Sequence, residues 1–194
     1  MARIRSLGLV ALGALLALLV VAGASAASGL FGGEELESLE TPEFSFDYPA
    51  AWQPIEGVEF PLAEGAGERQ VGANTVGLDP DNWVTAFRND SGIEISAANI
   101  DQFVAQARPF YAAVAKRTGA RLLAAPYRVT EAGLPGMRYR MALTSVRGTE
   151  VEDEVTMLFR GRANYVLNCQ SARARATEMT AGCERVFDTF AAGR

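Results

Sequence analysis

The feature that most constrains the fold is an alternation of apolar and polar residues on both sides of residues 145–149. A chain reversal there produces two strands that share one apolar face, interrupted at Asp153. The paired positions on that face are Met137–Met157, Tyr139–Val155, Met141–Asp153 and Leu143–Val151. The opposite face receives a cross-strand pair of Arg140 and Glu154. The pattern therefore predicts an antiparallel hairpin of strongly specified register, because a slip of one residue would scatter the apolar set.

A second turn is predicted at 161–163. It sets Phe159 opposite Tyr165 and Val155 opposite Cys169. The apolar face then continues across a third strand and ends on this cysteine.

The last segment, 174–191, carries apolar residues at helical spacing, and Cys183 lies in its apolar stripe. Cys169 ends the apolar face of the preceding strand, so the two cysteines stand on facing surfaces. In an oxidising compartment this arrangement predicts a Cys169–Cys183 disulfide. The alternative is a pair of free or redox-active thiols, but a C-x-x-C spacing is absent from the sequence.

The first half of the domain predicts three shorter strands. Aromatic and polar residues alternate over 44–48, which is typical of a half-buried strand, and Pro49 ends it. Residues 61–73 are rich in glycine and predict a loop. Strands are expected at 74–78 and 83–88, separated by a tight turn.

A long helix is predicted over 99–118, where apolar residues recur along one stripe. Asn99 is the expected N-terminal cap. Pro109 lies inside the stripe, so we expect a kink or two shorter helices. Together these elements predict an α+β fold in which an antiparallel β-sheet is flanked by helices.

Residues 1–26 have the form of a secretory signal, with Arg3 and Arg5, a long apolar run and an A-x-A cleavage site. The run is close to the length of a membrane span, so a retained single-pass anchor at the N-terminus is the alternative. Residues 27–43 are Gly-rich and then acidic, and predict a flexible linker. We therefore expect 44–192 to be the single domain of an exported protein, secreted or held in the cell envelope or periplasm.

Composition excludes several functions. The 194 residues contain no histidine, which removes Ser-His-Asp triads, Cys-His nucleophiles and histidine metal ligands. The formal net charge of −5 is a poor match to nucleic acid. The sequence contains no cofactor or metal motif that we would assign, so we expect a protein without a cofactor.

The opening of the domain has the form F-x-F-x-Y-P-x-x-W, from Phe44 to Trp52. A central helix, a meander of long strands and a Tyr-Val-Leu strand before a Phe-rich terminal helix follow it. In these features residues 42–192 resemble the PsbP-like α/β/α sandwich group, most closely its exported actinobacterial LpqN-type members. The resemblance implies an antiparallel sheet flanked by helices and a non-catalytic role in binding or assembling partners. The lipobox cysteine of the lipoprotein members is absent here.

Three aromatic residues, Tyr48, Trp52 and Trp83, are candidates for a binding patch, although such residues more often pack the end of a sheet. The oxygen-bearing side chains of 79–82 stand close together as in a calcium loop. Pro80 interrupts them and no distal glutamate follows, so a plain turn is the better interpretation.

Charged residues of the last strands offer two further candidates. The acidic side chains are Glu150, Glu152, Glu154 and Asp153. The three glutamates could act in acid–base chemistry, although a solvated face paired with Arg140 is the simpler interpretation. Asp153 falls on the apolar face, where a buried charge needs a partner, unless the hairpin end extends past the core. We favour the latter.

The basic side chains that bracket the last strand are Arg160, Arg162, Arg173 and Arg175. They could bind an anionic headgroup or a cell-wall phosphate, although scattered arginines in an arginine-rich chain are the simpler interpretation.

We expect a non-catalytic envelope domain that binds a protein partner or an envelope component through a sheet edge or through residues 53–83. The first alternative is a carrier of a lipid or other apolar molecule, suggested by its methionine and phenylalanine content. The second alternative is a hydrolase that works without histidine. An apolar cavity would favour the carrier, and converging carboxylates in a cleft would favour the enzyme.

Overall fold

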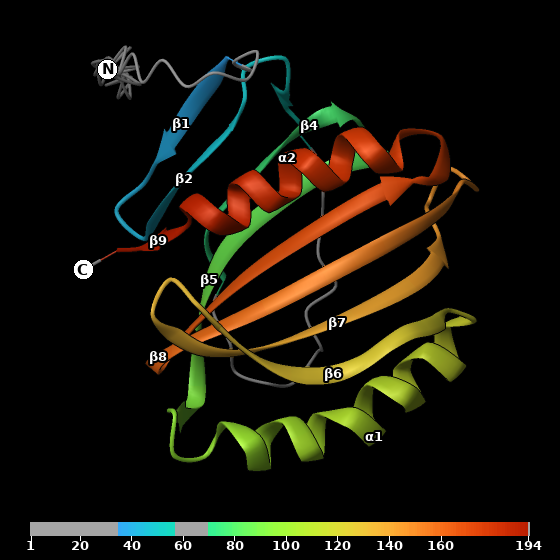
Figure 1. Cartoon of the computed structure of the whole chain (residues 1–194). Helices are drawn as coiled ribbons and strands as arrows, with labels where there is room; N and C mark the ends of the chain where they lie inside the picture. Colours follow the sequence, from blue (N-terminus) through green and yellow to red (C-terminus); the bar gives the residue numbers. More distant parts are fainter. Residues whose placement is uncertain (1–34, 57–69, 194) are drawn as a thin grey trace, which may run out of the picture. The chain divides into compact units, whose positions relative to one another are not determined.

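The computed structural model of the chain describes residues 35–56 and 70–193, and Figure 1 shows its elements. The strands and helices are β1 Leu36–Glu40, β2 Phe44–Pro49, β3 Gln53–Pro54, β4 Gln70–Asp79, β5 Asn82–Ile95, α1 Ile100–Thr118, β6 Arg121–Glu131, β7 Leu134–Thr144, β8 Glu150–Ala172, the 3-10 turn η1 Arg173–Arg175, α2 Ala176–Thr189 and β9 Ala191–Ala192. The predicted signal segment, the first part of the predicted linker and most of the predicted loop at 61–73 lie outside the described residues.

Two antiparallel sheets organise the domain. The larger has the order β3-β4-β5-β8-β7-β6, and the smaller has the order β1-β2-β9. Strand β7 pairs with β8 in the predicted register, with Met137 opposite Met157 and Arg140 opposite Glu154. The connecting turn closes with a hydrogen bond from the Ser145 amide to the Thr149 carbonyl. The hairpin prediction is therefore confirmed.

The strand β8 spans 23 residues and folds back on itself near Gly161, which has a left-handed φ of 61°. If β8 ran straight at about 3.3 Å per residue, Asp153 and Asn168 would lie about 50 Å apart. Their side chains instead share a hydrogen bond. The first half of β8 pairs with β7 and the second half with β5, and Figure 1 shows the two halves side by side. The predicted reversal is present.

The predicted facing of this third strand is wrong by one residue. Phe159 and Val155 pack in the cluster on the α1 side, whereas Tyr165 and Cys169 pack in the cluster on the α2 side. Residues 164–170 are all buried, because both faces of the sheet are covered here. The sequence of this strand therefore lacks the exposed polar positions that would show which face of the sheet each side chain occupies.

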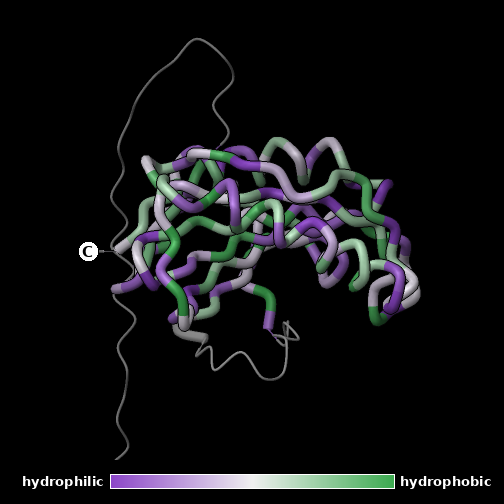
Figure 2. The backbone as a smooth tube through the Cα atoms, turned by 90° about the horizontal axis from the view of Figure 1, so that it is seen from below, coloured by the Kyte–Doolittle hydropathy of each residue, from purple (hydrophilic) through white to green (hydrophobic). Residues whose placement is uncertain are grey.

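Helices on opposite faces of the large sheet give the domain two hydrophobic cores. Helix α2 crosses one face over β5 and β8, and α1 runs beside β6 (Figure 1). The α2 side also holds the aromatic rings of β2, and Phe44 and Phe46 are each 1% exposed. Hydrophobic and hydrophilic residues alternate along the strands between the helices (Figure 2). The predicted α+β fold with helices flanking an antiparallel sheet is confirmed.

The disulfide between Cys169 and Cys183 joins β8 to α2 as predicted. At the position before Cys183, Gly182 allows α2 to approach the sheet closely. A Cβ atom on Gly182 would lie 2.2 Å from the ring of Trp52, so any larger residue would displace the helix or the indole.

Three predictions about the linker and the long helix need correction. The predicted linker contains β1, which pairs with β2 along its whole length. Its mostly exposed, acidic sequence resembles a linker because only one edge of β1 is paired with another strand. The helix α1 is a single element with Pro109 inside it, rather than two shorter helices. The Asn99 side chain does not cap it, but accepts from the Ser96 amide and donates to the Glu94 carbonyl.

Candidate functional site

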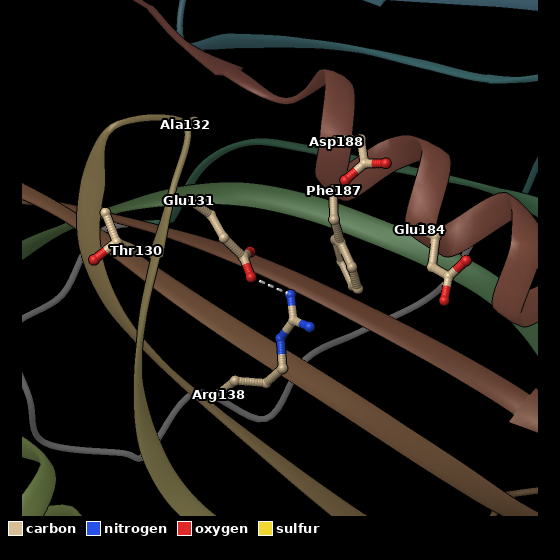
Figure 3. Close-up of a pocket in the computed structure, with 7 residues that line it drawn as sticks. All are labelled: Thr130, Glu131, Ala132, Arg138, Glu184, Phe187 and Asp188. Carbon is tan, nitrogen blue, oxygen red and sulfur yellow. Dashed lines mark hydrogen bonds and ion pairs between the residues drawn. The ribbon is translucent and has the colours of Figure 1, made fainter.

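A cleft of about 330 Å³ opens between the β6–β7 turn and the C-terminal half of α2 (Figure 3). Its lining residues are Thr130, Glu131, Ala132, Arg138, Glu184, Phe187 and Asp188. We call this group the acidic cleft. It joins segments far apart in the sequence, and both of its walls follow from local backbone rules.

The first wall is a two-residue turn. Ala132 and Gly133 have φ values of 50° and 71°, so both central residues are left-handed, as a type I′ hairpin turn requires. This turn pairs Glu131 with Leu134 and brings the Glu131 carboxylate to the edge of the cleft. The second wall is the exposed side of α2. Glu184 and Asp188 lie four residues apart and therefore on the same side of the helix.

The floor of the cleft is Arg138, whose guanidinium is held on several sides. It contacts Glu131 at 2.5 Å and Glu154 at 3.1 Å, and its Nε donates to the Thr156 hydroxyl at 2.8 Å. Its Cζ lies 4.9 Å from the centre of the Phe187 ring, which is a cation–π distance. Arg138 therefore stabilises the junction of sheet and helix and has little capacity left for an anion.

The acidic cleft carries an excess of negative charge. Three carboxylates line it, from Glu131, Glu184 and Asp188, against the single guanidinium of Arg138. Within the described part of the chain, neither Glu184 nor Asp188 makes an ion pair that would neutralise it. The chemistry of the lining suits a cationic group and does not suit an apolar molecule.

The three predicted aromatic residues do not form an exposed patch. Trp52, Trp83 and Tyr48 are 2%, 6% and 8% exposed. The Tyr48 hydroxyl donates to Glu37 at 2.8 Å, and burial together with this carboxylate raises the Tyr48 pKa to about 12. The Trp83 indole donates to the Pro80 carbonyl. Packing, the competing interpretation, accounts for these residues.

The 79–82 segment is a closed turn, the interpretation favoured over a calcium loop. Both Asp79 oxygens accept from the Asn82 side-chain amide, and one of them also accepts from the Asp81 backbone amide. Asp81 accepts from the Thr149 hydroxyl, which ties this turn to the β7–β8 turn. Over residues 35–56 and 70–193, no group of three or more acidic or cysteine side chains is placed to hold a metal ion.

The glutamates of β8 form the salt-bridged face that we favoured. Arg140 contacts Glu152 at 2.8 Å and Glu154 at 3.8 Å on the exposed side of the sheet. Such exposed pairs contribute at most about 1 kcal/mol each to stability.

Asp153 was expected to extend past the core, and this expectation is wrong. Its Oδ1 is buried without a hydrogen-bond partner, while the Asn168 side-chain amide donates to the carboxylate. Desolvation by burial, partly offset by this hydrogen bond, raises the Asp153 pKa from 3.8 to about 7. The ring of the nearby Tyr139 lies 4.1 Å from that of Tyr111 in α1, with the two ring planes tilted by 35°, and burial raises the Tyr139 pKa as well. Asp153 is therefore a group that titrates inside the fold near neutral pH.

The four arginines proposed as one anion site lie in two places. Arg160 and Arg162 flank the reversal of β8, whereas Arg173 and Arg175 follow the far end of its second half.

The acidic cleft itself was not predicted from the sequence. Its only local signal is the spacing of Glu184 and Asp188 on an amphipathic helix, and nothing local places Glu131 opposite them.

No helix within residues 35–56 and 70–193 has both the length and the hydropathy needed to cross a membrane.

Comparison with known proteins gives a likeness of structure. No protein-family model and no curated protein matches the sequence. The domain is similar to cyanobacterial PsbP (CyanoP) from Synechocystis, with 13% identity, a TM-score of 0.51 and coverage of 86% of this chain and 98% of that one.

Two other solved structures match at lower TM-scores. LpqN, described as involved in cell envelope biogenesis of Mycobacterium tuberculosis, matches at 12% identity and a TM-score of 0.46, covering 82% of this chain and 92% of that one. A Bacteroides thetaiotaomicron protein matches at 12% identity and a TM-score of 0.48, covering 81% of this chain and 48% of that one. Identity at this level concerns the fold alone. The chain has a PsbP-like α+β fold.

Proposed function

We propose that this protein is an exported, non-catalytic domain of the cell envelope that binds a basic segment of a protein partner in the acidic cleft. The observation that carries the proposal is the uncompensated charge of Glu184 and Asp188 beside a floor that Arg138 already fills. A lysine or arginine side chain entering the cleft would neutralise these carboxylates in a partly enclosed site, where charge pairs are stronger than in open water.

The disulfide supports an extracytoplasmic location, since bonds of this kind persist in oxidising compartments. The signal segment at 1–26 supports the same location from the sequence. A PsbP-like fold by itself assigns no activity, so the proposal depends on the site rather than on the fold.

The lining of the cleft favours this binding role over the two alternatives. A carrier needs an apolar cavity, whereas this cleft is lined mainly by carboxylates, a guanidinium and a hydroxyl. A hydrolase would use two carboxylates that flank a substrate in different protonation states. Here Glu131 is held by Arg138, and Glu184 and Asp188 stand side by side on one helix.

The test is a binding titration with a short acetylated peptide that contains two arginines, followed by calorimetry at low and at physiological salt. The variant E184Q/D188N should bind about ten-fold more weakly, since two partly screened charge pairs are lost. The matched control E40Q/E94Q removes the same charge from exposed positions outside the cleft. Equal losses in both variants would reduce the effect to net charge and overturn the proposal, as would binding that salt leaves unchanged.

A further inference from the structure

A second pocket, of about 200 Å³, lies on the α2 side of the large sheet at the reversal of β8. Its walls come from β5, from β8, from the connection between β1 and β2 and from Gly193, which follows β9. The charged residues that line it are Arg88, Arg160 and Glu43, and Tyr165 contributes an aromatic wall. This pocket has the opposite character to the acidic cleft, because its guanidinium groups outnumber its carboxylate.

The two guanidinium groups retain unused donors. Arg88 contacts Asp90 through Nη2 at 2.6 Å, but its Nε is buried and has no hydrogen-bond acceptor. A buried donor without an acceptor is rare in folded proteins. Arg160 is exposed and commits only Nη1, which donates to the Gly193 carbonyl. Its other N–H groups have no partner among the described residues.

The surrounding charge is positive in an acidic protein. Among the residues that line the pocket, the two guanidinium groups of Arg88 and Arg160 stand against the single carboxylate of Glu43, in a chain whose net charge is −5. An anion at this point gains attraction that the rest of the surface does not offer.

We propose that this pocket binds a phosphate group, either as a free phosphate ester or as the headgroup of an anionic lipid. The free donors of Arg88 and Arg160 come from two strands and do not form one planar fork, which a carboxylate would prefer. A tetrahedral anion offers oxygens in several directions and can accept from both arginines at once. The site is separate from the acidic cleft, so it extends the proposed function rather than depending on it.

The test uses isotopically labelled protein, purified after export with its disulfide intact, and an NMR titration with inorganic phosphate at constant ionic strength. We expect saturable shifts of the Arg88 and Arg160 side-chain Nε–H signals. The variants R88K and R160Q should each weaken binding at least ten-fold, and R88K does so while it keeps the charge. The control R173Q/R175Q should bind as the wild type does.

A second arm identifies the source of the phosphate. Vesicles of phosphatidylcholine with phosphatidic acid are compared with pure phosphatidylcholine vesicles in a flotation assay. Flotation that requires the acidic lipid and is lost in R160Q would assign the pocket to a headgroup, whereas phosphate binding without flotation would assign it to a soluble ester. Shifts that never saturate, or equal losses in the R173Q/R175Q control, would overturn the proposal. R160Q changes an exposed residue, so it keeps the test valid even if R88K fails to fold.

Discussion

Asp153 makes the stability of this fold depend on pH in an unusual direction. Its pKa rises from 3.8 to about 7 on folding, so the folded protein binds the proton more tightly than the unfolded chain does. Stability is therefore highest below the unfolded value, and it falls as the pH rises through the folded value. A difference of about three pKa units corresponds to at most about 4 kcal/mol, at about 1.4 kcal/mol per unit. The residue is partly exposed and solvent screens part of this effect, so the expected loss lies between about 1 kcal/mol and that upper limit.

The substitution Asp153→Asn isolates this effect, because the amide keeps the shape of the carboxyl and cannot ionise. Urea unfolding followed by tryptophan fluorescence should give D153N and the wild type similar stabilities at pH 4. At pH 8.5 the variant should be the more stable by about 1–4 kcal/mol. The control E150Q changes an exposed carboxylate of the same strand and should shift stability equally at both pH values. A constant difference between D153N and the wild type across this range would refute the assignment of a raised pKa.

Three further predictions test the packing and the processing of the chain. Replacing Cys169 and Cys183 together by alanine should lower the free energy of unfolding by about 2–5 kcal/mol, and an unchanged urea curve would contradict a stabilising role for the disulfide. Gly182→Ala should lower stability by about 1–3 kcal/mol in thermal unfolding through overpacking against the indole ring, whereas the control Gly92→Ala has open space around it and should change little. Native mass spectrometry of the exported protein should show a chain that lacks residues 1–26 and two cysteine hydrogens. An apolar adduct of a few hundred daltons would instead favour the carrier alternative.

The parts of the fold that the sequence predicts are those where one face is buried and the other is exposed. The β7–β8 hairpin is such a case, because Arg140 and Glu154 mark the exposed face and fix the register. The helix α2 is another, since its apolar stripe is bounded by charged residues such as Glu184. The disulfide followed from placing its two cysteines on these two elements.

The parts that the sequence does not predict depend on contacts made elsewhere in the chain. Asn168 is 1% exposed on a strand buried on both faces, so polarity does not report its facing. The strand β1 has an exposed, acidic sequence, and its pairing partner β2 is the only described element that makes it a strand. The acidic cleft brings Glu131 close to α2, which is far from it in the sequence. No local sequence pattern predicts that these two segments meet.

The smaller sheet has a consequence for when the domain can fold. Strand β2, the first to enter the core, pairs with β9 at the very end of the described chain, with Phe44 opposite Ala192. Its aromatic rings also pack with Phe187 and Phe190, which come from the last helix and the residue that follows it. A nascent chain that still lacks this helix cannot bury them. Completion of the core therefore requires segments from the two ends of the described domain to meet, and contacts of such long sequence separation slow folding.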